Sequence, residues 1–290
     1  MQEFDLIVLG SGPGGYVAAI RASQLGLKTA IVEKENLGGV CLNWGCIPTK
    51  ALLKSAQVFE YLNHAEDYGL SAESVSYDFG KVINRSRGVA DSMSKGVQFL
   101  MKKNQIAVID GYGTLLPGKK VKVTGAEKEQ TISASHIIIA TGARSRELPN
   151  LPQDGVKVIG YREAMTLKTQ PKKMIVVGSG AIGIEFAYFY NAMGTEVTVV
   201  EYQPNIVPVE DEEISKQLER SFKKAGIIIK TSTEVTNVDT SGSGVKATIR
   251  SKDKEEVIEA DIVLSAVGIK SNIENIGLEI EPRTSPNQRM

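Results

Sequence analysis

A pattern of apolar run, glycine turn, helical stretch and second apolar run occurs twice in this 290-residue chain. The first copy leads from residues 4–9 into the turn GSGPGG at 10–15, and the second leads from residues 174–177 into GSGAIG at 178–183. An acidic residue, Glu33 or Glu201, closes the second run 23 positions after the first glycine of its copy. Short, β-branched runs on either side of a helix are typical of buried parallel strands, so each copy predicts a βαβ unit.

The chain is therefore expected to be an α/β protein with two Rossmann-like, nucleotide-binding domains on central parallel sheets. Residues 106–133 alternate between strand-like runs and glycine turns, and a Ser/Gly-rich turn lies at 241–244, so each domain is expected to carry an added antiparallel β-meander. We also predict helices over 55–102 and 211–224 and a buried strand at 137–140. The prolines of 148–152 indicate an extended linker, which gives domains at 1–145 and 146–270 and a tail at 271–290.

The glycines at the first, third and sixth positions of each turn have separate expected roles. The first permits the turn, the third lets a pyrophosphate approach the backbone, and the sixth lets helix and strand pack closely. The start of the following helix then presents N–H groups and a positive dipole to the phosphates. These glycines are Gly10, Gly12 and Gly15 in the first copy and Gly178, Gly180 and Gly183 in the second.

The acidic residues at the strand ends indicate which nucleotide each site prefers. Glu33 and Glu201 are placed to accept hydrogen bonds from an adenosine ribose, and a carboxylate there repels a 2′-phosphate. Tyr202 and Gln203 follow Glu201, so no arginine is adjacent to bind that phosphate, and we expect NAD rather than NADP at the second site. The alternative is that both turns are structural and bind no ligand.

The chain has two cysteines, Cys41 and Cys46, shortly after Glu33. Five helical steps of roughly 1.5 Å separate α-carbons by about 7.5 Å, which exceeds the roughly 7 Å limit for a disulfide. A bridge would therefore need a distorted turn, for which Gly45 offers backbone freedom, and would be easily reduced. Two alternatives stay open: a pair of inert buried thiols, or half of a zinc site, for which the isolated His64 and His136 lack ligand spacing.

Charge and hydropathy exclude other classes of function. Lys and Arg total 34 and Asp and Glu total 34, so no basic field favours nucleic acid or anionic lipid. The longest aliphatic runs are far shorter than the roughly 20 residues that span a bilayer, and the first ten residues lack a signal-peptide pattern. We expect a cytoplasmic protein with no membrane partner and no bound metal.

In combination these segments resemble the flavin-dependent disulfide oxidoreductases, the class I pyridine nucleotide-disulfide oxidoreductases, and among them the dihydrolipoamide dehydrogenase group. The matching segments are GPGGYVAAIRA at 12–22, GGVCLNWGCIPTK at 38–50, ATG at 140–142 and GSGAIGIE at 178–185. The resemblance covers roughly residues 3 to 280, the FAD and NAD domains of the family. It implies FAD at the first turn and NAD at the second.

The resemblance also implies individual roles. Cys41 would be the interchange thiol that attacks lipoyl sulfur, and Cys46 the thiol against the flavin ring. Lys50 would lie near flavin N5 and pair with Glu185. The residues expected to bind the cofactors are Gly10, Gly12, Gly14, Gly15, Glu33, Gly113, Ala140, Thr141, Gly142, Gly178, Gly180, Ile182, Gly183, Glu201 and Gly268.

The implied reaction oxidises dihydrolipoyl groups through the Cys41–Cys46 disulfide and FAD, with reduction of NAD⁺. The implied partner is the lipoyl group of a 2-oxo acid dehydrogenase or glycine cleavage complex. Three features of the family have no counterpart in these residues: the third flavin motif, the interface domain that forms the homodimer, and the His-x4-Glu base. We therefore expect an incomplete enzyme with impaired turnover. The alternatives are a non-catalytic nucleotide-binding remnant and an NADH diaphorase.

Overall fold

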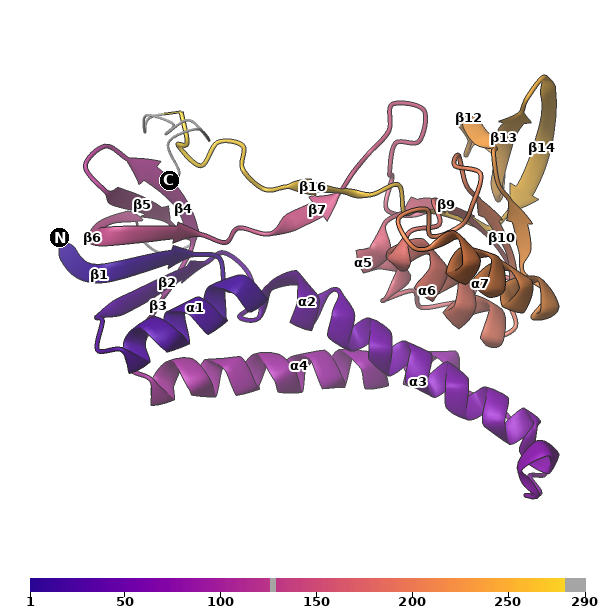
Figure 1. The fold of residues 1–290 in the computed structure, drawn as a ribbon, viewed down its shortest axis with the longest axis horizontal. Coiled ribbons are helices and arrows are strands. Elements are labelled where there is room, and N and C mark those ends of the chain that lie inside the picture. Colours follow the sequence, from indigo (N-terminus) through magenta and orange to yellow (C-terminus); the bar gives the residue numbers. More distant parts are fainter. Residues whose placement is uncertain (126–128, 280–290) are drawn as a thin grey trace. The chain divides into compact units, whose positions relative to one another are not determined.

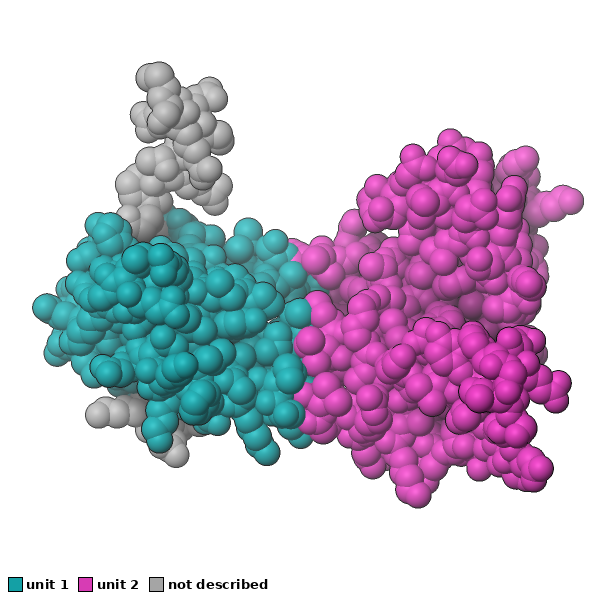
Figure 2. All heavy atoms as spheres, turned by 60° about the horizontal axis from the view of Figure 1, so that its bottom comes forward, with its two compact units in different colours: residues 1–43, 90–144, 271–290 teal, residues 44–89, 145–270 magenta. Residues whose placement is uncertain are grey.

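The computed structural model describes residues 1–125 and 129–279. The chain divides into two compact units (Figure 2). Unit 1 contains Met1–Asn43, Ala90–Arg144 and the described residues from Ser271 onward, and unit 2 contains Trp44–Val89 and Ser145–Lys270. No helix within the described ranges is both long enough and apolar enough to cross a membrane.

Unit 1 is built on a mixed six-stranded sheet in the order β3-β2-β1-β6-β5-β4 (Figure 1). The first four strands are parallel, and β5 is antiparallel to both β6 and β4. Its elements are β1 (Gln2–Leu9), α1 (Pro13–Gln24), β2 (Thr29–Glu33), α2 (Gly39–Asn43), β3 (Ala107–Asp110), β4 (Tyr112–Leu116), β5 (Lys120–Thr124) and β6 (Glu129–Ile139). A long helix, α4 (Phe79–Lys103), is divided between the units at Val89 and Ala90.

The core of unit 1 explains why an antiparallel meander is attached to its parallel sheet. Ile7, Leu9 and Val32 of the parallel strands pack with Val121 and Val123 of β5 in one buried cluster. Burying each such side chain stabilises the fold by roughly 1.5–3 kcal/mol. The meander therefore covers a sheet face that would otherwise expose β-branched side chains.

The end of β6 differs from the buried strand predicted at 137–140. Ile138 and Ile139 are 38% and 39% exposed. Along the described part of β6, β5 pairs only up to Ser133, whereas β1 pairs up to Ile139. The prediction was wrong for these two residues because an apolar run does not reveal whether a strand has neighbours on both sides.

Residues 271–279, the first part of the tail expected at 271–290, pack against unit 1. Ile276 is 2% exposed, and its carbonyl oxygen accepts a 2.8 Å hydrogen bond from the N–H of Leu115. Leu278 packs against the core of unit 1. The segment is therefore ordered by tertiary contacts with β4, while the expected tail at 282–290 lies outside the described residues.

Unit 2 is built on a five-stranded parallel sheet in the order β11-β10-β9-β15-β8, with a separate antiparallel sheet β12-β13-β14. Helices α5, α6 and α7 accompany the parallel sheet (Figure 1). Its elements are α3 (Cys46–Asn63), the 3-10 helix η1 (Ala65–Tyr68), β8 (Val158–Ile159), α5 (Tyr161–Ala164), β9 (Lys173–Val177), α6 (Ala181–Ala192), β10 (Glu196–Val200), α7 (Glu212–Lys224), β11 (Ile228–Lys230), β12 (Glu234–Asp239), β13 (Val245–Ser251), β14 (Lys254–Ala260) and β15 (Ile262–Ser265). The helix predicted at 211–224 is present, with Asp211 as its N-cap.

The meander of unit 2 forms its own sheet, unlike β4 and β5 of unit 1, but it also packs on the parallel strands. Val245 and Ile249 of β13 pack with Ile175 and Val263 of the parallel sheet in one buried cluster. Leu151 belongs to the same cluster and is fully buried. The segment expected as a linker at 148–152 thus contributes a core side chain to unit 2, and the units divide at Arg144 and Ser145, next to the boundary expected at 145.

Residues 44–89, which the expected boundaries place with residues 1–145, cluster instead with unit 2. Helix α3 packs on α6, where Lys50 pairs with Glu185 and the Tyr188 hydroxyl donates a 2.5 Å hydrogen bond to Glu60. These contacts join segments more than 120 positions apart in the sequence. The chain crosses between the units again where β7 (Ala143–Ser145) pairs with β16 (Ile269–Ser271).

Candidate redox and nucleotide-binding site

The first glycine turn connects β1 to α1, and close backbone approach accounts for two of its glycines. A Cβ added to Gly10, at φ +94°, would lie 2.3 Å from the carbonyl oxygen of Ala140. A Cβ added to Gly15 would lie 1.9 Å from the carbonyl oxygen of Gly10. Both are far inside van der Waals contact, so these positions accept only glycine. Gly12 is different, since a Cβ there meets no atom within 4 Å.

The second turn, between β9 and α6, repeats this geometry. A Cβ on Gly178 would lie 2.4 Å from Ala266 O, and one on Gly183 would lie 2.0 Å from Gly178 O. Gly180 again faces open space. Gly12 and Gly180 are the N-caps of α1 and α6, with φ/ψ of −62°/179° and −65°/178°, and neither supplies a side-chain cap. Each helix therefore begins beside an open glycine, which fits a phosphate group that binds backbone N–H groups.

The two acidic residues are held in the same way in both copies. Glu33 and Glu201 are 9% and 7% exposed. One carboxylate oxygen of Glu33 accepts hydrogen bonds of 2.9 Å and 2.6 Å from the N–H and hydroxyl of Ser11, and Glu201 accepts bonds of 2.8 Å and 2.6 Å from Ser179. The other oxygen of each carboxylate accepts backbone N–H groups just after its strand, including Gln203 N–H at 2.7 Å in the second copy.

Ser11 and Ser179 are site residues that the sequence interpretation missed. Each occupies the second position of its glycine turn, and the identical letters GSG in both copies were the available signal. Their hydrogen bonds fix each carboxylate beside its turn in a buried place, where such bonds to a charged group are strong. Glu201 accepts three such hydrogen bonds and can accept one more, because a carboxylate offers about four lone-pair positions, whereas Glu33 already accepts four.

Other predicted cofactor-binding residues lie near these turns or in the core. The carbonyl of Ala140 faces Gly10, and the hydroxyl of Thr141 donates a 2.7 Å hydrogen bond to Asn272 O. Gly142 has φ +69°, as a turn after β6 requires. A Cβ on Gly113 would lie 2.9 Å from Leu9 Cδ2, so core packing explains that glycine. Gly268 has φ +110°, and its carbonyl accepts a 3.0 Å hydrogen bond from Arg146 N–H. Gly14 is exposed and Ile182 is half-buried.

The cysteines lie in a break between two helices. Cys41 is on α2, Cys46 is the first residue of α3, and the two are joined as a disulfide. The helical path stops at Asn43 and restarts at Cys46, with Gly45 as the N-cap of α3 at φ −143°. This interruption removes the geometric obstacle that a continuous helix would present to the bridge.

The segment that carries Cys41 lies against the first glycine turn. A Cβ on Gly39, at φ +59°, would lie 2.6 Å from the Cα of Gly12. The side-chain amide of Asn43 donates to the carbonyls of Leu37 and Gly39 at 3.0 Å and 2.9 Å, which fixes the segment. Unit 1 therefore places a sulfur-bearing helix directly beside the open glycine of its phosphate turn.

Cys46 is exposed and Cys41 is partly buried. Because Cys46 begins an 18-residue helix, the positive end of the α3 dipole stabilises a thiolate there when the disulfide is reduced. These are properties of an exchangeable disulfide rather than of a buried structural one.

Unit 2 brings together two predicted catalytic residues, Lys50 of α3 and Glu185 of α6, as an ion pair. Their side chains are 63% and 29% exposed, so solvent screens the pair and its contribution to stability is small. Three positions further along α6, Tyr188 donates to Glu60 of α3. Burial, followed by this hydrogen bond and the Glu60 charge, raises the pKa of Tyr188 above its usual value.

The structure places His64 at the end of α3 and His136 on β6. His64 Nδ1 lies 2.9 Å from Glu60 O at the end of α3, and His136 is an exposed residue of β6. Within residues 1–125 and 129–279, no group of three or more His, Cys, Asp or Glu side chains gathers as a metal site would require.

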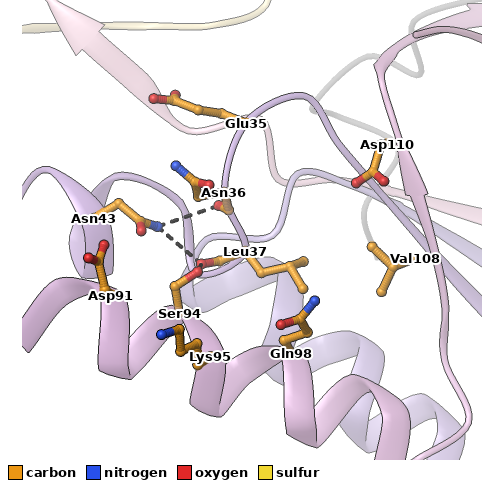
Figure 3. Close-up of a pocket in the computed structure, with 10 residues that line it drawn as sticks. All are labelled: Glu35, Asn36, Leu37, Asn43, Asp91, Ser94, Lys95, Gln98, Val108 and Asp110. Atoms are coloured by element: carbon orange, nitrogen blue, oxygen red, sulfur yellow. Dashed lines mark hydrogen bonds between the residues drawn. The ribbon is translucent and has the colours of Figure 1, made fainter. Parts of the chain in front are cut away.

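Unit 1 also contains a polar cavity of about 430 Å³ that no sequence prediction included. It lies between α4, the end of β3 and the loop after β2, and Figure 3 shows Asn43 hydrogen-bonded to the backbone of that loop. Its lining residues are Glu35, Asn36, Leu37, Asn43, Asp91, Ser94, Lys95, Gln98, Val108 and Asp110. None of the predicted cysteines or turn glycines lines it.

Two nucleotide-type turns and an exchangeable disulfide define a class of protein, the oxidoreductases that couple a dinucleotide to a disulfide. Comparison with known proteins agrees, since the sequence profile of the pyridine nucleotide-disulphide oxidoreductases matches residues 4–287. The chain belongs to that family.

Curated relatives are more specific. The chain is 51% identical over 295 residues to a dihydrolipoyl dehydrogenase of Rhizobium etli, covering 96% of this chain and 61% of that protein. It is 44% identical over 288 residues to the Bacillus subtilis dihydrolipoyl dehydrogenase, with coverage of 96% and 61%. The chain thus spans about 60% of the length of these relatives.

Solved structures confirm the expected fold class. LpdA from Mycobacterium tuberculosis superposes with a TM-score of 0.87 at 27% identity, covering 96% of this chain and 61% of that one. The flavoprotein disulfide reductase RclA from Escherichia coli has a TM-score of 0.81 at 24% identity and so supports the fold alone. Parallel sheets with added antiparallel meanders are therefore the architecture of this chain.

Proposed function

We propose that this chain forms the nucleotide-binding and disulfide-bearing part of a dihydrolipoyl dehydrogenase. FAD would bind at the first turn, through Gly10, Gly12 and Glu33, with NAD at the second turn, through Gly180 and Glu201. The observation that carries the proposal is the contact between Gly39 and Gly12, which sets the Cys41 segment beside the open phosphate turn. The open faces of Gly12 and Gly180 fit two dinucleotides.

The cysteines would exchange with a dihydrolipoyl group. One lipoyl thiolate attacks Cys41, the Cys41–Cys46 bond breaks, and Cys46 leaves as a thiolate at the start of α3. The second lipoyl thiol then displaces Cys41, which closes the lipoyl disulfide and leaves both cysteines reduced. FAD, held at the first turn, would supply the chemistry that accepts these two electrons and passes a hydride to NAD⁺.

Lys50 and Glu185 would act as positioning residues in this scheme. Lys50 is the fourth residue after Cys46 on α3, one helical turn along the same face, and Glu185 pairs with its ammonium group. Glu185 would thereby hold the Lys50 ammonium group in position on the helix that begins at Cys46. The partner would be a lipoyl group of a 2-oxo acid dehydrogenase or glycine cleavage complex. The active form would be a homodimer, as in the family. It would act in the cytoplasm, a reducing compartment suited to a disulfide that is repeatedly reduced and reformed.

The test is the absorption spectrum of the full chain after incubation with FAD. We expect a bound-flavin spectrum and, on adding dithiothreitol, a long-wavelength band that is present in wild type and in Cys41→Ser but absent in Cys46→Ser. Cys41→Ser is the matched control, since it also lacks the disulfide. Absence of flavin binding, or a band unchanged in Cys46→Ser, would overturn the proposal.

A further inference from the structure

Trp44, the single tryptophan of the chain, lies between the two cysteines in sequence and contacts two arginines. The guanidinium carbon of Arg87 lies 4.3 Å from the centre of a Trp44 ring, and that of Arg162 lies 5.0 Å away. Both distances are well within the roughly 6 Å range of cation–π attraction, for which tryptophan is the best partner. The segment 41–46, which carries both cysteines, thus contacts Arg87 and Arg162 through its only aromatic side chain, Trp44.

The two arginines come from different elements of unit 2. Arg87 is on α4 and Arg162 is on α5, 43 and 118 positions from Trp44. Both elements are themselves fixed. On α4, the neighbouring Arg85 donates a 2.8 Å hydrogen bond to Ala51 O of α3. At the start of α5, the Glu163 side chain accepts a 3.0 Å hydrogen bond from Gly160 N–H.

Both arginines attract the indole ring, so together they restrict the movement of Trp44. Holding Trp44 in position also restricts the backbone at Cys46, because Cys46 is only two residues away. When the disulfide is reduced, the covalent link that fixes the segment is lost and the two thiols are free to separate. The contacts of Trp44 would then hold the Cys46 end of the segment, while the hydrogen bonds of Asn43 hold the Cys41 end.

We propose that Trp44, gripped by Arg87 and Arg162, is a positioning residue that keeps Cys41 and Cys46 within bonding reach after the disulfide is reduced. It acts by raising the effective concentration of one thiol at the other, which favours reclosure of the bond. The inference rests on the proposed function in one respect, that the cysteine pair cycles between disulfide and dithiol.

The test is the thiol–disulfide equilibrium of the full chain in glutathione buffers, which needs no cofactor. One glutathione thiolate attacks the disulfide and forms a mixed disulfide, and a second releases oxidised glutathione and two cysteine thiols. Thiol alkylation and mass measurement give the reduced fraction. We compare Trp44→Leu, Arg87→Lys and Arg87→Gln with wild type, and use Arg220→Gln, at an exposed position of α7, as the control.

We expect the equilibrium constant for reduction to rise about tenfold in Trp44→Leu, equivalent to roughly 30 mV for a two-electron couple. Arg87→Lys should shift it in the same direction by at least threefold, because lysine keeps the charge but loses the planar stack. Arg220→Gln should match wild type. Far-UV circular dichroism checks that each variant is folded, and Arg87→Lys, which keeps charge and approximate volume, serves if Trp44→Leu does not fold.

Two results would overturn the inference. If the variants match wild type, the anchor contributes equally to both redox states. If Arg87→Gln favours the disulfide while Arg87→Lys matches wild type, the arginine acts by its charge on a thiolate and not by positioning. A wild-type disulfide that glutathione and dithiothreitol both fail to reduce would instead contradict the proposed function.

Discussion

Gly180 and Gly183 lie three residues apart in the second glycine turn, but an added methyl group meets opposite surroundings at the two positions. At Gly183 the new Cβ would lie 2.0 Å from the carbonyl oxygen of Gly178, whereas at Gly180 it meets no atom within 4 Å. The two alanine variants therefore separate a packing role from a ligand-binding role within one turn.

The size of the first effect follows from the overlap. Relieving a 2.0 Å contact requires α6 to move away from β9 by more than about 1 Å, and overpacking of this kind costs about 1–3 kcal/mol. We expect the free energy of unfolding of Gly183→Ala to fall by about 3 kcal/mol, and its Tm by about 6–12 °C for a unit of this size.

Gly180→Ala should keep its stability within about 1 kcal/mol, because the entropy gain of alanine and its poorer capping of α6 oppose each other. Its methyl group would occupy the space through which a pyrophosphate reaches the backbone, so the Kd for NADH should rise at least tenfold. Urea unfolding and NADH fluorescence titration measure the two quantities. The reasoning is refuted if Gly180→Ala unfolds as easily as Gly183→Ala, or if it binds NADH as tightly as wild type.

Three further outcomes follow from the same site. Ser179→Ala removes the 2.6 Å hydrogen bond to the buried Glu201 and should lower the free energy of unfolding, measured in urea, by about 1.5–3 kcal/mol. The control variant Ser221→Ala, on an exposed helix face, should change it by less than about 0.5 kcal/mol. Equal effects of the two variants would contradict the role of Ser179. NADH should bind at least tenfold more tightly than NADPH in direct titration, since the Glu201 carboxylate repels a 2′-phosphate, and comparable affinities would show that Glu201 does not select the nucleotide. Burial and Glu60 raise the pKa of Tyr188, so its stabilising contribution is complete below about pH 10, the pKa of an unfolded tyrosine, and is lost as pH rises through the folded pKa. Between pH 9 and pH 11 the free energy of unfolding should therefore fall less steeply in Tyr188→Phe than in wild type. Parallel profiles of the two proteins would exclude this contribution of Tyr188.

Features that depend on neighbouring residues could be predicted from sequence. The two βαβ units and the helix ending at Lys224 are local patterns, and both are present. A glycine turn is also local, because the contacts that forbid a side chain at Gly15 and Gly183 are made within the same turn. Periodicity and spacing report such features directly.

Burial of apolar runs was less predictable. Residues 137–140 and 148–152 were interpreted in opposite ways, as core and as linker, yet Ile139 is 39% exposed and Leu151 is fully buried. Composition shows that a run is apolar, but only the neighbouring strands decide whether it is covered. The contacts of Ile276 with β4 were missed for the same reason.

The sequence therefore determined two glycine turns, the acids that follow them and a closely spaced cysteine pair, since each depends on residues a short distance apart along the chain. Tertiary structure alone decided that Tyr188 bonds Glu60 and that Arg87 and Arg162 meet at Trp44. Contacts over such separations depend on how whole helices pack against sheets, and packing follows the shape and volume of many side chains at once.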